Sequence, residues 1–118
     1  MAPITENAAA EQYAKVRIET APHKTAIYIL HEKCLHLVSK AFFYADARRA
    51  NLDRAQNILV QLQSALAAGR DDPVSQGLFF TYDYCYRLLE RGDVADIRNA
   101  RLLLERLCTT FRTLLTRP

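Results

Sequence analysis

Apolar residues recur along most of this chain at spacings of three and four, which is the repeat of one face of an α-helix. Four such stripes follow one another, over residues 27–44, 52–66, 74–89 and 97–114. A half-buried strand would instead alternate apolar and polar residues at every second position. The repeat therefore predicts an all-α protein with four long helices.

The breaks between the stripes carry residues that start and stop helices. Asn51 and Asp72 are good N-caps, and Pro73 suits the first position of a helix. Gly69 and Gly92 suit the position that follows a helix. We expect helices near residues 22–47, 51–68, 73–91 and 93–115. Because the connections are short, neighbouring helices should run antiparallel, as in an up-down four-helix bundle.

The 118 residues suit a single domain. Residues 22–118 make up the predicted bundle. Residues 1–21 precede it as a mobile or short-helical segment, because they carry too few apolar side chains to hold a helix in place. Leucines that lie on the stripes should form the core, namely Leu59, Leu62, Leu104 and Leu107.

The N-terminal residues lack the basic and apolar regions of a secretory signal, and no apolar run approaches the roughly 20 residues that cross a bilayer. We therefore expect a cytoplasmic protein without membrane insertion. Cys34, Cys85 and Cys108 lie at apolar helical positions and are expected to be buried free thiols. The 16 Lys and Arg against 13 Asp and Glu give a charge of only +3, without a basic block, so no nucleic-acid partner is expected.

Residues that would support catalysis or metal binding are sparse. His31, Cys34 and His36 form the one cluster that resembles a ligand set, but His36 lies about 140° around a helix from His31. A structural zinc site needs about four ligands, so we expect no metal. Asp83 and Arg87 stand at i,i+4 and are interpreted as a surface pair. No phosphate loop or catalytic-serine motif is present, and we expect neither a cofactor nor an enzyme.

The segment from Leu78 to Tyr86 packs five aromatic residues into nine positions. Successive residues of a helix are 100° apart, so these rings cannot all face one core. Two interpretations follow with equal weight. Exposed rings often mark a binding surface, whereas tyrosines at the edge of a core commonly keep only their hydroxyls in water.

The same segment carries a resemblance to a known family. Tyr82-Asp83-Tyr84-Cys85-Tyr86-Arg87-Leu88-Leu89 resembles the "YDYMxRRL" signature of the flagellar secretion chaperones called FliS. Arg54-Ala55-Gln56-Asn57-Ile58-Leu59 is similar to the family's "KAQxII" segment, and Thr20-Ala21-Pro22 to its "TASP" segment. A tyrosine such as Tyr13 also recurs there. The chain departs from the family at Leu88, and at Leu30-His31-Glu32-Lys33, which stands where "LYDG" is usual.

The resemblance implies an antiparallel bundle that binds the disordered C-terminal segment of flagellin, prevents premature polymerisation and presents the client for type III export. Other flagellar export components are possible further partners, and the chaperone should be mainly a monomer or a weak dimer. The residues that we expect to contact the client are Ile27, Leu30, His31, Cys34, Tyr82 and Tyr86. The residues that we expect to plug the client site when it is empty are Tyr13, Val16 and Ile18.

Two other classes of function compete with this interpretation. A helical adaptor that dimerises through its aromatic face would share the fold and have no flagellin client. An enzyme or cofactor-binding bundle would need buried carboxylates or paired histidines, and the sequence has no Glu-x-x-His pair. The chaperone is therefore the favoured prediction, and the adaptor is the alternative.

Overall fold

The computed structural model describes residues 21–66 and 72–116 of the chain. Within these ranges it forms four α-helices: α2 (Ala21–Phe43), α3 (Arg48–Ala65), α4 (Pro73–Arg91) and α5 (Val94–Thr116). They confirm the predicted all-α fold. Apart from Ala21, the predicted N-terminal segment lies outside the described residues, and the domain boundary that follows it stays a prediction.

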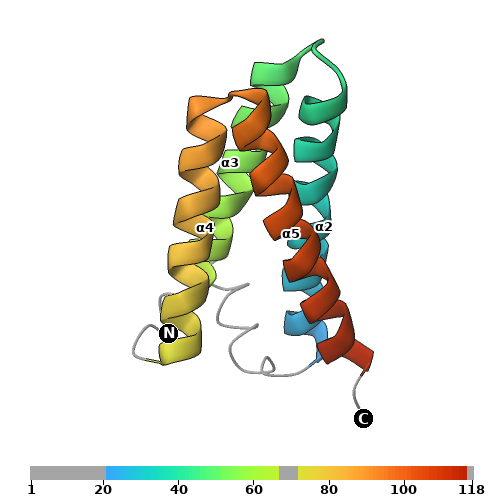
Figure 1. Cartoon of the computed structure of the whole chain (residues 1–118). Helices are drawn as coiled ribbons and strands as arrows, with labels where there is room; N and C mark the ends of the chain where they lie inside the picture. Colours follow the sequence, from blue (N-terminus) through green and yellow to red (C-terminus); the bar gives the residue numbers. More distant parts are fainter. Residues whose placement is uncertain (1–20, 67–71, 117–118) are drawn as a thin grey trace, which may run out of the picture.

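The helices form a ring in chain order around one core. α2 packs against α3 and α5, and α4 packs against the same two neighbours, so α2 and α4 lie on a diagonal. Successive helices run in opposite directions (Figure 1). This is the up-down four-helix bundle that short connections predict.

The turn between α2 and α3 differs from the prediction. α2 ends at Phe43 instead of near residue 47, and α3 begins at Arg48 instead of Asn51. The N-cap of α3 is Ala47, whose φ of 57° is left-handed, and Asn51 is buried inside the helix. The prediction of Asn51 as N-cap is therefore wrong. The physical reason is that the Arg48 Nε–H donates to the carbonyl of Ala41 at 2.6 Å, which satisfies the end of α2 and lets α3 begin earlier.

The starts and stops predicted for the second half of the chain are confirmed. The Asp72 carboxylate accepts a hydrogen bond from the backbone N–H of Ser75 at 3.3 Å, and Pro73 occupies the first turn of α4. Gly92 follows α4 with a φ of 73°, and its N–H donates to the carbonyl of Leu88 at 3.0 Å. Gly69 lies outside the described residues.

The core draws on all four helices. Leu59, Leu62 and Leu104 are fully buried, as predicted, whereas Leu107 is only partly buried and packs against the core from its edge. All three cysteines are buried and unpaired, as expected.

A buried glutamine joins α3 to α4. The side-chain amide of Gln56 donates to the carbonyl of Tyr86 at 3.2 Å and to the carboxylate of Glu90 at 2.9 Å. Its side-chain oxygen accepts from the guanidinium of Arg49 at 2.8 Å. Arg49 also donates to the carbonyl of Leu89 at 3.1 Å. Two segments that stood out in the sequence, 54–59 and 82–89, are thus tied to each other.

Candidate functional site

The described residues contain no group of three or more His, Cys, Asp and Glu side chains placed to hold a metal ion. Asp83 and Arg87 form the predicted surface pair, with 2.9 Å between Oδ2 and Nε. No helix in the described ranges is long and apolar enough to cross a membrane. What the bundle does present is a buried polar contact, an open groove and a row of exposed aromatic rings.

The buried polar contact crosses the diagonal of the bundle. Nε2 of His31, on α2, lies 2.8 Å from the hydroxyl of Tyr82, on α4, and both side chains are fully buried. Phe111, from α5, stacks on the imidazole with 4.6 Å between ring centroids. Three helices therefore meet at His31.

The hydrogen bonds of His31 define its protonation. Nδ1 lies 2.9 Å from the carbonyl of Ile27, which can only accept, so Nδ1 carries the proton. Nε2 of the neutral ring then accepts from the Tyr82 hydroxyl. Burial lowers the pKa of His31, opposed in part by the Ile27 carbonyl, and burial raises the pKa of Tyr82. The pair is thus held neutral.

The residues predicted to contact a client divide into two groups. His31, Cys34 and Tyr82 lie in the core, where no external ligand touches them in this arrangement of helices. Ile27, Leu30 and Tyr86 are partly buried and pack against the core from outside. The residues predicted to act as a plug, Tyr13, Val16 and Ile18, lie outside the described residues.

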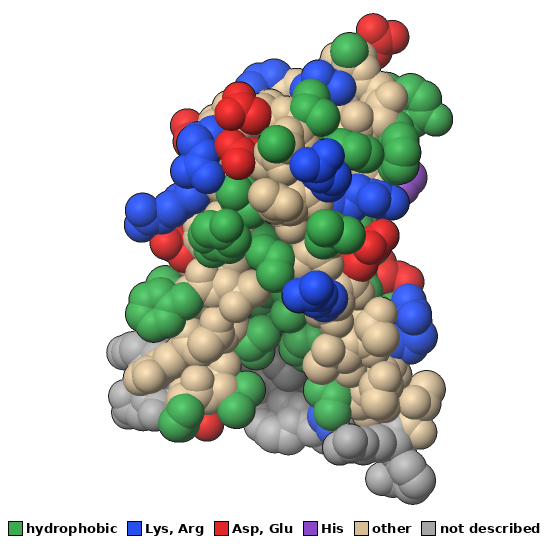
Figure 2. Space-filling view, in the orientation of Figure 1, with side chains coloured by type: hydrophobic (Ala, Val, Ile, Leu, Met, Phe, Trp, Pro, Cys, Tyr) green, Lys and Arg blue, Asp and Glu red, His purple; other side chains and the backbone are tan. Residues whose placement is uncertain are grey.

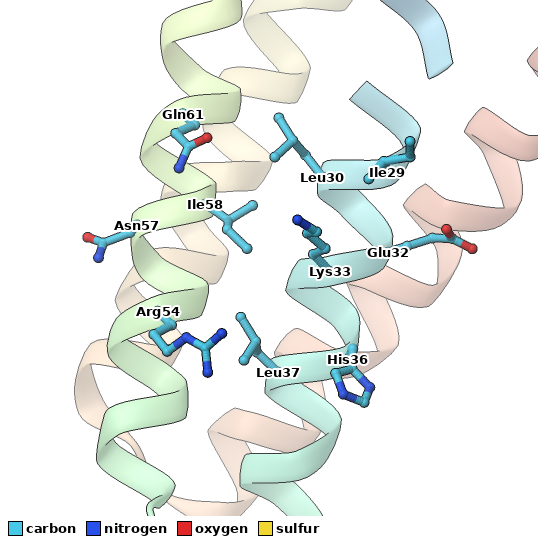
Figure 3. A pocket seen from close by; sticks show the side chains of 10 residues that line it. All are labelled: Ile29, Leu30, Glu32, Lys33, His36, Leu37, Arg54, Asn57, Ile58 and Gln61. Carbon is cyan, nitrogen blue, oxygen red and sulfur yellow. The ribbon is translucent and has the colours of Figure 1, made fainter. Parts of the chain in front are cut away.

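An open groove of about 730 Å³ runs between α2 and α3 (Figure 3). Its apolar side chains are Ile29 and Leu30, together with the more deeply placed Leu37 and Ile58. The polar residues around it are Glu32, Lys33, His36, Arg54, Asn57 and Gln61. Of the residues predicted from the sequence, only Leu30 lines it.

Sequence reasoning missed this groove, although a signal for it exists. Ile29, Lys33 and Leu37 follow one another at i,i+4, immediately beside the stripe that faces the core. Arg54, Ile58 and Gln61 make a similar row on the facing helix. Such rows become recognisable as the two walls of one groove only when the packing of α2 on α3 is known.

The aromatic residues of α4 face in two directions. Tyr82 is buried, whereas Phe79, Phe80 and Tyr84 are 43%, 69% and 51% exposed. The prediction that some rings must lie on the surface is confirmed. Figure 2 shows apolar side chains over α4 and along the seam between α4 and α5. Exposed rings in such numbers are typical of surfaces that bind another protein.

The fold and these surfaces define a helical-bundle binding protein. The comparison with protein families gives a more particular answer: the family model "Flagellar protein FliS" matches residues 5–117. The chain therefore belongs to the FliS family, which is a family of flagellar export chaperones and not of enzymes. The resemblance recognised in the sequence is confirmed. Comparisons with curated proteins and with solved structures gave no match.

Proposed function

We propose that this protein acts in the cytoplasm as an export chaperone for flagellin, binding the client's disordered C-terminal segment until it is exported. The observation that carries the proposal is the family match over residues 5–117, supported by the open apolar surfaces on α2, α3 and α4. A bound segment is unavailable for polymerisation, so the client remains a monomer that the export apparatus can accept.

The physical form of the interaction follows from the surfaces. A segment that is disordered when free loses conformational entropy on binding, which limits affinity and permits later release. Amphipathic helices of the client would place apolar residues in the shallow grooves of the bundle. Ile27, Leu30 and Tyr86 are the proposed contacts at the surface. His31, Cys34 and Tyr82 would act from beneath by holding the helices that form those grooves.

The N-terminal residues Tyr13, Val16 and Ile18 are proposed to cover part of this surface when no client is present. A cover that must leave before the client binds lowers the apparent affinity by the fraction of molecules that are open. Three apolar anchors on a short segment stabilise the closed state by about 1–3 kcal/mol after ordering costs. Removal of the cover should therefore tighten binding by about 5- to 160-fold.

The test is calorimetric titration of the flagellin C-terminal segment into the full chain and into a chain that lacks residues 1–18. Binding by both proteins, tighter in the shortened one, is the expected result. Binding that weakens on deletion would keep the chaperone function and make residues 13–18 part of the client site. An absence of binding to both proteins would end the proposal.

A further inference from the structure

The buried contact between His31 and Tyr82 lies where the bundle is least tightly closed. Of the four pairs of neighbouring helices, α4 and α5 make the least contact with each other. These two helices diverge from the turn at Gly92 toward the start of α4 and the end of α5 (Figure 1). The imidazole of His31 is the polar group at which α2, α4 and α5 meet, because Tyr82 bonds to it and Phe111 stacks on it.

We propose that His31 is an acid-sensitive switch: uptake of a proton by its imidazole releases the first half of α4 from α2 and α5 and so weakens the hold on the client. The release of α4 is a property of the chain alone. Only the effect on the client rests on the proposed function.

The hydrogen bonds around the imidazole fit only its neutral form. The Nδ1–H of His31 donates to the carbonyl of Ile27 at 2.9 Å, and Nε2 accepts from the hydroxyl of Tyr82 at 2.8 Å. A proton on Nε2 would make that atom a second donor, directed at the hydrogen of the hydroxyl. The hydroxyl would then have to rotate, and its own proton would lose its acceptor.

The titratable groups of the surrounding core carry no charge that could balance a proton on His31. Cys34 on α2 and Tyr82 and Cys85 on α4 are buried, and burial raises the pKa of each, so all three are neutral. Burial likewise raises the pKa of Cys108 on α5. α3 contributes apolar side chains and the uncharged Asn51 and Gln56 to the described core.

The charged groups near this cluster already have partners. Those that adjoin it along α2, α4 and α5 are Glu32, bonded to Tyr28; Arg112, bonded to Tyr28; Glu105, paired with Arg101; and Asp83, paired with Arg87. The ring of Phe111 attracts a cation weakly, which does not replace the water that a buried charge loses. A protonated His31 therefore favours any arrangement that admits water to the imidazole.

The first half of α4 is the part of the bundle that can move to admit water. The second half is tied to α3, because Gln56 and Arg49 donate to the carbonyls of Tyr86 and Leu89. Among the described residues, side-chain hydrogen bonds join residues 73–82 to another helix at two places. One is the buried contact with His31, and the other is an exposed bond from Gln63 to the carbonyl of Phe79 at 3.3 Å.

Movement of α4 would also change the surface that is proposed to hold the client. Tyr86 belongs to α4, whereas Ile27 and Leu30 belong to α2, on the other side of the diagonal. A client that contacts both helices binds the closed arrangement better than the open one. Its apparent affinity should therefore fall as acid increases the open population.

The first test is amide hydrogen exchange of the chain alone, at several pH values and in low, non-denaturing urea. Protection is corrected for the intrinsic effect of pH on exchange. The amides of residues 76–82 should be less protected than those of 55–62 in α3, and less sensitive to urea, because a local opening exposes little surface. Their protection should fall by up to about tenfold per pH unit below about 6.5, since opening is coupled to one proton.

Two variants assign this effect to His31. The amide of His31→Gln can donate and accept as the neutral imidazole does but takes up no proton, so the pH dependence at residues 76–82 should disappear. His36→Gln removes an exposed histidine of the same helix and should behave as the native chain does. If His31→Gln does not fold, His31→Phe replaces it.

Two results of this experiment would overturn the switch. One is the same loss of protection with acid in the native chain and in the His31 variant. The other is equal protection and equal urea dependence for residues 76–82 and 55–62, because the proton would then enter only on global unfolding.

The second test is calorimetric titration of the flagellin C-terminal segment at about pH 7.5 and about pH 5. Acid should weaken binding to the native chain and to His36→Gln about threefold or more beyond its effect on His31→Gln, in which ionisation of the segment itself is the only change left. An equal effect of acid on all three proteins would overturn the link to the client. An absence of binding at both pH values would refute the proposed function, whereas the exchange experiment would still decide whether the switch exists.

Discussion

Replacement of Tyr82 by Phe should destabilise the bundle out of proportion to the single oxygen atom removed. The hydroxyl donates to Nε2 of His31 across 2.8 Å, and both side chains are fully buried. Without that donor, the imidazole keeps an acceptor that neither protein nor solvent satisfies. A buried polar group left in this way costs about 1–3 kcal/mol.

The measurement is urea unfolding followed by helical circular dichroism. For a denaturant dependence of about 2 kcal/mol per molar urea, the midpoint should fall by about 0.5–1.5 M. Tyr84→Phe is the matched control, because Tyr84 lies on the same helix and is 51% exposed. Loss of the Tyr84 hydroxyl should change the free energy of unfolding by no more than about 0.5 kcal/mol.

A double variant separates the hydrogen bond from simple packing. When His31 and Tyr82 are both replaced by Phe, no buried polar group is left without a partner, and much of the lost stability should return. Equal midpoints for Tyr82→Phe and Tyr84→Phe would refute the argument that this contact stabilises the diagonal of the bundle. The argument would also be refuted if the double variant lost as much free energy of unfolding as the two single variants lose when their losses are added together.

Three further predictions concern stability. Burial lowers the pKa of His31 below 6.5, so as the pH falls the unfolded chain takes up a proton before the folded chain does. The free energy of unfolding should therefore fall as the pH drops below about 6.5. In urea titrations at several pH values, His31→Phe should make that fall smaller. Leu104→Ala should lower the free energy of unfolding by about 2–5 kcal/mol in the same assay. Leu102→Ala, at a half-exposed site, should lower it by about 0.5 kcal/mol or less. Equal losses of stability would show that the wrong face of α5 has been assigned to the core. Gly92→Ala should lower the free energy of unfolding by about 1–2 kcal/mol, because the φ of Gly92 is 73°. Gly77→Ala, at an open position within a helix, should raise the free energy of unfolding by about 0.5–1 kcal/mol. A melting temperature unchanged in both variants would contradict the assigned backbone geometry.

The sequence was sufficient for the helices because their signals are local. The stripe that contains Leu59 and Leu62 identifies a buried face from spacing alone, and Asp72 with Gly92 marks the ends of α4. The turn before α3 was misplaced because no glycine or proline marks it. The end of α2 depends on the hydrogen bond between the Arg48 side chain and the Ala41 carbonyl. The helix propensities of single residues do not reveal such a contact.

The surfaces were harder to predict because they depend on contacts between distant residues. His31 is three positions from Cys34 and so shares its buried face, yet its partner Tyr82 is 51 residues away. The sequence therefore led us to predict His31 and Tyr82 as contacts for the client. Their burial in the core follows only from the packing of three helices. The groove was missed for the same reason, since Lys33 and Arg54 stand on separate helices.

The central claim is that the chain holds the C-terminal segment of flagellin. It is tested most directly by calorimetric titration of purified monomeric flagellin, and of flagellin truncated before its disordered C-terminal segment, into the full chain. The chaperone account predicts one client bound per chain for the intact protein and no measurable heat for the truncated one. Equal binding of both proteins, or of neither, would contradict it.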